Sequence, residues 1–98
     1  MKSDTSNPKS TSRKILIVDD INNNLVILEA LLTEFGYSVE SAINGKDALE
    51  KLRMKEFDLI ISDILMPVMD GFTFCRTVKE DERLRKIPLV FYTATYKD

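Results

Sequence analysis

Acidic side chains follow two of the most apolar stretches of the chain. Asp19 and Asp20 come directly after residues 15–18, and Asp63 closely follows residues 59–61. Short apolar runs bounded by turn residues are typical of strands buried in a parallel sheet. Because the carboxyl ends of parallel strands meet at one edge of a sheet, the three carboxylates are expected to lie close together if the first and third strands are neighbours. A simpler alternative is that one acid of the first pair is a helix N-cap and the other is solvated.

Three converging carboxylates repel one another, and a hard dication would neutralise them. Carboxylates, a backbone carbonyl and waters suit octahedral Mg²⁺. A carboxylate that keeps one oxygen free can act as a nucleophile and form an aspartyl-phosphate. Asp63, which directly follows the central strand, is the best candidate for this nucleophile. Thr93 follows the last apolar run and offers a hydroxyl that is placed to donate to a phosphoryl oxygen.

The composition of the 98-residue chain excludes several other kinds of site. Histidine is absent, which excludes histidine-based acid–base catalysis within the chain and any His-ligated zinc. One cysteine allows neither a disulfide framework nor a CxxC metal site. The net charge of −2 does not favour nucleic-acid binding, and no apolar run is long enough to span a membrane. We therefore expect a cytoplasmic domain that binds neither nucleic acid nor membrane.

The elements that must position the acids alternate regularly along the chain. Residues 1–12 are rich in Ser, Thr, Asn and Lys and predict a flexible tail, followed by one domain over residues 13–98. Strands are predicted over residues 14–18, 37–42, 57–62 and 87–92, and helices over residues 22–35, 46–54 and 71–81. This alternation with short connections predicts an α/β fold, with a parallel sheet and helices on both of its faces.

The predicted helices have apolar faces that indicate which side packs on the sheet. Leu25, Leu28, Leu32 and Phe35 share one face of the first helix. In the last helix we expect Phe74, Cys75 and Val78 to be buried, with Asp70 as its N-cap.

Several motifs together carry a resemblance to a known family. They are, in chain order, Asp19-Asp20, Asp63, Met66-Pro67, Met69-Asp70-Gly71 and Thr93-Ala94. As a set they resemble the receiver domain of two-component response regulators, and the resemblance covers the whole chain apart from the tail. It implies a flavodoxin-like, three-layer α/β/α fold with strand order 2-1-3-4(-5).

The resemblance also implies a role for each residue of the site. Asp63 matches the phosphoacceptor, and Asp20 and Asp63 match the side-chain ligands of Mg²⁺. Asp19 matches a mainly water-mediated metal contact, and Leu65 the residue that lends its backbone carbonyl. Thr93 matches the switch hydroxyl. The partner implied is a sensor histidine kinase or a histidine phosphotransfer protein, and the chain would be a signalling domain rather than an enzyme.

The chain also departs from the family pattern. A receiver continues with a fourth helix, a fifth strand and a fifth helix, and its fifth strand ends in a lysine that contacts the phosphoryl group. Lys97 falls too early to match that lysine. We therefore expect an incomplete receiver that lacks the fifth strand and last two helices. Its exposed sheet edge would favour self-association, and in isolation it would be partly unfolded or self-associated.

Two other functions compete with phosphotransfer. An incomplete receiver could act only as a docking or dimerisation module, and phosphate uptake in the presence of Mg²⁺ would distinguish the two. A phosphohydrolase of the haloacid-dehalogenase type needs a second aspartate two residues after its nucleophile, where this chain has Leu65. A P-loop enzyme is excluded because the chain lacks the glycine-rich lysine loop.

Overall fold

The computed structural model describes residues 12–93, so the predicted tail lies outside the described residues except for Ser12. All seven predicted elements are present in the predicted order, and their ends differ from the prediction by at most two residues. They are β1 (Lys14–Val18), α2 (Asn22–Glu34), β2 (Ser38–Ala42), α3 (Gly45–Met54), β3 (Leu59–Asp63), α4 (Gly71–Glu80) and β4 (Leu89–Tyr92).

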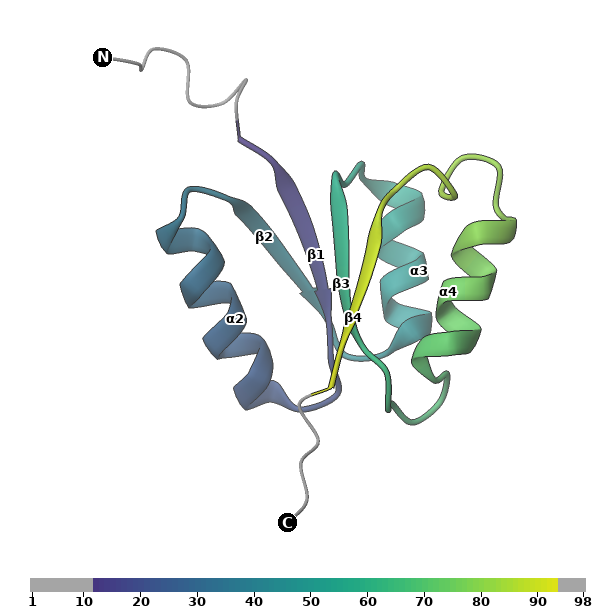
Figure 1. Ribbon diagram of the computed structural model, residues 1–98, viewed down its shortest axis with the longest axis horizontal. Helices are drawn as coiled ribbons and strands as arrows, with labels where there is room; N and C mark the ends of the chain where they lie inside the picture. Colours follow the sequence, from purple (N-terminus) through teal and green to yellow (C-terminus); the bar gives the residue numbers. More distant parts are fainter. Residues whose placement is uncertain (1–11, 94–98) are drawn as a thin grey trace.

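The strands form one parallel sheet in the order β2-β1-β3-β4. Helix α2 covers one face of this sheet, and α3 and α4 cover the other, as Figure 1 shows. The predicted flavodoxin-like order and three-layer architecture are therefore confirmed. Within residues 12–93, β4 pairs only with β3 and so forms an edge of the sheet.

Residues of β1 are buried on both faces of the sheet, which explains why the strand is continuously apolar. Leu16 and Val18 join the larger core beneath α3 and α4, where Phe74 and Leu52 are also fully buried. Ile15 and Ile17 point to the opposite face and, with Leu25 of α2, form a smaller core. Since successive side chains of a strand alternate between faces, only an unbroken apolar run satisfies both layers.

Two of the residues that we expected to be buried are more exposed than the sequence suggested. Phe35 is 75% exposed, because α2 ends at Glu34 and the chain turns away through Gly36, whose φ is +94°. The helical period therefore no longer directs Phe35 onto the sheet. Cys75 is half-buried, because it lies beside the inward-pointing Phe74 on α4 rather than directly beneath the helix.

The start of α4 packs directly on the end of β3. The Gly71 backbone N–H donates to the carbonyl of Ile64 at 2.7 Å. A Cβ at Gly71 would lie 2.7 Å from the carbonyl oxygen of Asp63 and 2.8 Å from the Cα of Ile64. Asp70 is the N-cap of α4, as predicted, and accepts from the Thr73 N–H at 2.8 Å. The absence of a side chain at Gly71 thus lets the helix approach the backbone that carries Asp63.

We expect Gly71→Ala to destabilise the protein by about 1–3 kcal/mol, the usual cost of overpacking, because the added Cβ meets backbone atoms that must shift. Urea denaturation monitored by circular dichroism measures this free energy of unfolding.

Gly45→Ala is a matched control, because Gly45 is also the first residue of a helix and follows the side-chain N-cap of Asn44. Its added Cβ would meet the side chain of Met69, with the nearest atom, Sδ, at 2.9 Å. A flexible side chain can move aside, so the loss should be smaller. Equal losses in the two variants would contradict our explanation of Gly71.

Candidate functional site

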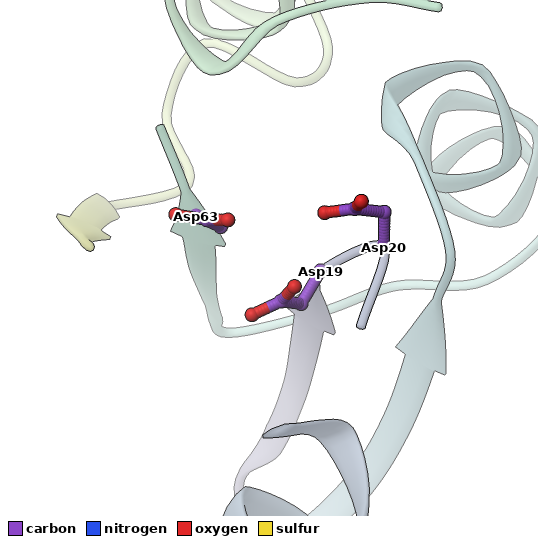
Figure 2. Close-up of side chains that lie close together, drawn as sticks. All are labelled: Asp19, Asp20 and Asp63. Atoms are coloured by element: carbon purple, nitrogen blue, oxygen red, sulfur yellow. The ribbon is translucent and has the colours of Figure 1, made fainter. Parts of the chain in front are cut away.

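Three carboxylates converge at the carboxyl edge of the sheet. Asp63 is the last residue of β3, and Asp19 and Asp20 directly follow the neighbouring strand β1. One carboxylate oxygen from each residue lies within 4.8 Å of those of the other two. Figure 2 shows the three side chains gathered around a shared space beyond the strand ends. Parallel pairing of β1 with β3, in which Val18 is the partner of Ser62, produces this convergence.

Asp19 is fully buried, and three donors satisfy its carboxylate. Its Oδ1 accepts from the Ile21 N–H at 2.9 Å, and its Oδ2 accepts from Asn24 Nδ2 at 3.0 Å. The Tyr92 hydroxyl also donates to Oδ2. These hydrogen bonds compensate for the water that the carboxylate loses on burial. Asp19 is therefore held in one orientation.

Asp63 is equally buried, but its carboxylate accepts few hydrogen bonds. Its Oδ1 accepts from the Leu65 N–H at a long 3.4 Å, and its Oδ2 has no hydrogen-bond partner among residues 12–93. Burial, and next the negative charge of Asp19, raise the pKa of Asp63 above its ordinary value of 3.8. A buried carboxylate oxygen without a partner, beside two other acids, is suited to a cation or to a reacting group.

The other predicted site residues lie around these acids. Asp20 is exposed, and Leu65 is exposed in the loop after β3. Thr93 is exposed directly after β4, at the same edge of the sheet as Asp63, because Asp63 pairs with Tyr92. Their predicted roles as metal ligands and as a switch remain predictions.

The loop between β3 and α4 contains a strained turn. The Met69 N–H donates to the Pro67 carbonyl at 2.6 Å around Val68, whose φ is 69°. This three-residue γ-turn with positive φ is unusual for a β-branched side chain. Strained backbone of this kind tends to occur near functional sites, and here it lies in the loop that follows Asp63.

Sequence reasoning missed the two side chains that hold Asp19. Asn24 lies in the first turn of α2, and Tyr92 is the last residue of β4. Only the strand register shows that Tyr92 points to the same face as Asp63. The simpler alternative, in which one acid of the first pair is a helix N-cap, is wrong. The N-cap of α2 is Ile21, which makes no side-chain cap, and Asp19 instead holds the Ile21 N–H from outside the helix.

Within residues 12–93, none of the helices has the length and apolar character that a membrane crossing requires.

Known proteins share both the sequence and the fold of this chain. The model of the response regulator receiver domain family matches residues 15–98. Response regulator PleD of Caulobacter vibrioides is 47% identical over 83 residues, which are 85% of this chain and 18% of PleD. The chain thus spans less than a fifth of that relative.

Solved structures agree with this sequence similarity. The receiver domain of a signal transduction histidine kinase from Syntrophus aciditrophicus matches with a TM-score of 0.82 and 41% identity, over 88% of this chain and 65% of that one. The receiver domain of a sensor histidine kinase from Pseudomonas aeruginosa, solved with a magnesium ion in its active site cleft, matches with a TM-score of 0.80 and 30% identity, over 87% and 70%. By sequence and by fold, this chain belongs to the response regulator receiver domain family.

Proposed function

We propose that this chain is the phosphoacceptor module of a two-component phosphorelay, in which Asp63 accepts a phosphoryl group from a histidine kinase or a histidine phosphotransfer protein. The observation that carries the proposal is the Oδ2 atom of Asp63, which is buried and has no hydrogen-bond partner among residues 12–93. Receiver domains of histidine kinases among the similar structures support this class of partner. Within the chain, we assign residues 13–98 to the receiver and residues 1–12 to a preceding tail.

The acids are well suited to Mg²⁺, which prefers oxygen ligands and keeps several waters. We assign the side chains of Asp20 and Asp63 and the backbone carbonyl of Leu65 as its ligands, and Asp19 as a contact through water. When bound, the ion would neutralise negative charge near the incoming phosphoryl group. The support from this chain is the convergence of three carboxylates within 4.8 Å and the pKa of Asp63, which burial and next the charge of Asp19 raise.

In the transfer step, Asp63 is the nucleophile. A carboxylate oxygen of Asp63 forms a bond to phosphorus, and the bond between phosphorus and the donor histidine nitrogen breaks. The electron pair of the broken bond stays on the imidazole nitrogen, and the histidine leaves as neutral imidazole after that ring takes up a proton from solvent. The Thr93 hydroxyl donates to a phosphoryl oxygen, and Asp19 keeps its orientation through Ile21, Asn24 and Tyr92.

In a protein that also carries the fourth helix, fifth strand and fifth helix of a receiver, we expect Asp63 to take up phosphate from acetyl phosphate in the presence of Mg²⁺, as an acyl phosphate that hydroxylamine releases. Asp63→Asn should abolish this label, because an amide cannot act as the nucleophile. Radiolabel retained on the protein after gel electrophoresis is the measurement.

Glu50→Gln, which removes an exposed carboxylate from the outside of α3, is the control and should label like the wild type. Equal labelling of Asp63→Asn and the wild type would overturn the assignment of Asp63. No labelling of the wild type by acetyl phosphate or by a phosphohistidine donor would favour the docking module.

Val90 on the edge strand β4, which is 51% exposed, is a candidate contact of that module.

The raised pKa of Asp63 predicts how stability depends on pH without metal. An acid whose pKa is higher in the folded state favours folding when protonated, so its contribution is complete below pH 3.8 and is lost as the pH rises through the folded value. Above its folded pKa, the ionised Asp63 therefore destabilises the fold relative to a neutral side chain. We expect Asp63→Asn to raise the metal-free melting temperature at pH 7 and to lose this advantage at pH 3. A variant that melts below the wild type at pH 7 would contradict this explanation.

Magnesium should stabilise the wild type by about 2.7 kcal/mol at 100 times its dissociation constant, by mass action. Asp20→Asn should lose most of this gain while raising the metal-free stability, because it removes a ligand and also a repelling charge. Thermal melts with and without Mg²⁺ measure both effects, and Glu50→Gln should keep the full gain. If Mg²⁺ raises the melting temperature of Asp20→Asn as much as that of the wild type, Asp20 is excluded as a ligand.

A further inference from the structure

We infer that Tyr92 is a positioning residue whose hydroxyl holds the Asp19 carboxylate in the orientation that the metal site needs. The effect on metal binding rests on the function proposed above, whereas the hydrogen bond itself does not. The observation is the donation from the Tyr92 hydroxyl to Asp19 Oδ2, which joins the end of β4 to the segment after β1.

The reach of this contact depends on the sheet order. Strand β3 lies between β1 and β4, and neighbouring strands are about 4.8 Å apart, so Tyr92 must reach across roughly 10 Å. Tyr92 is the register partner of Asp63, so its side chain starts on the same face as that acid. A short hydroxyl side chain at this position would not reach Asp19, whereas a tyrosine ring with a terminal hydroxyl does.

The hydrogen bonds of Asp19 are divided unequally between its two oxygens. Oδ2 accepts from both Asn24 and Tyr92, and Oδ1 accepts only from the Ile21 N–H. Each carboxylate oxygen has about two acceptor sites, so Oδ2 is filled and Oδ1 keeps one. Any contact of Asp19 with a metal, direct or through water, is therefore assigned to Oδ1. Without Tyr92, Asn24 alone would hold Oδ2, and the carboxylate would be freer to rotate.

The hydroxyl can be separated from the rest of the side chain. Tyr92 is half-buried at the end of β4, and a phenylalanine ring would fill the same space. Tyr92→Phe therefore removes the donor and keeps the packing. Tyr37→Phe is the matched control, since Tyr37 immediately precedes β2 at the opposite edge of the sheet and is 39% exposed.

The test is calorimetric titration of Mg²⁺ into the wild type, Tyr92→Phe, Asn24→Ala, the double variant and Tyr37→Phe. We expect Tyr92→Phe to bind Mg²⁺ about tenfold more weakly, as is common when a residue that orients a metal ligand is lost. Because Asn24 and Tyr92 hold the same oxygen, the two single losses should not simply multiply in the double variant. Tyr37→Phe should bind like the wild type.

A second measurement does not depend on metal. The carboxyl ¹³C resonance of Asp19 in the metal-free protein should shift in Tyr92→Phe and stay unchanged in Tyr37→Phe. If the wild type binds no Mg²⁺ but the Asp19 resonance shifts in Tyr92→Phe, the proposed metal site is refuted and the positioning contact is supported. If Tyr92→Phe binds Mg²⁺ as tightly as the wild type does, the inference is overturned and the proposed function is left intact. An unshifted Asp19 resonance would also overturn it.

Discussion

The mutual repulsion of carboxylates at one sheet edge is the constraint on which the rest of this structure depends. One carboxylate oxygen of each acid lies within 4.8 Å of those of the others. At about this separation two unit charges repel by roughly 3–4 kcal/mol at an effective dielectric constant of about 20. Asp19 and Asp63 are both fully buried, so solvent screens their repulsion little. The two acids differ in their hydrogen bonds. Asp19 is surrounded by three donors, whereas Asp63 keeps one oxygen without a partner among residues 12–93.

The apolar scaffold forces the acids to stay together despite this repulsion. Strand β1 is buried on both faces and lies between β2 and β3, so its end cannot move away from β3 without exposing both cores. On the other side, α4 begins at Gly71 in contact with the backbone of Asp63 and Ile64. The same packing that makes the fold stable therefore holds Asp63 in an unfavourable electrostatic environment, which a cation would relieve.

The far side of the site depends on β4. This strand pairs with β3 alone within residues 12–93, yet it ends at Tyr92, which directly precedes Thr93. The Tyr92 hydroxyl crosses β3 to reach Asp19 and so ties an edge strand to the centre of the sheet. A movement at the end of β4 would consequently displace the hydrogen-bond donor of Asp19 as well as Thr93.

Much of this protein follows from its sequence alone. The continuously apolar strands and their alternation with helices determine the layers and the parallel sheet, because these features depend on local periodicity. The meeting of the acids depends in addition on β1 and β3 being neighbours, which the resemblance to receiver domains implied and the sheet order confirms. Asp70 as the N-cap of α4 is equally local. The orientation of each side chain was not predictable in this way. The exposure of Phe35 depends on where α2 ends, and the hydrogen bond from Tyr92 to Asp19 depends on strand register across three strands. The unequal environments of Asp19 and Asp63 were likewise decided only by tertiary structure, because burial and hydrogen-bond partners come from residues far apart in the chain.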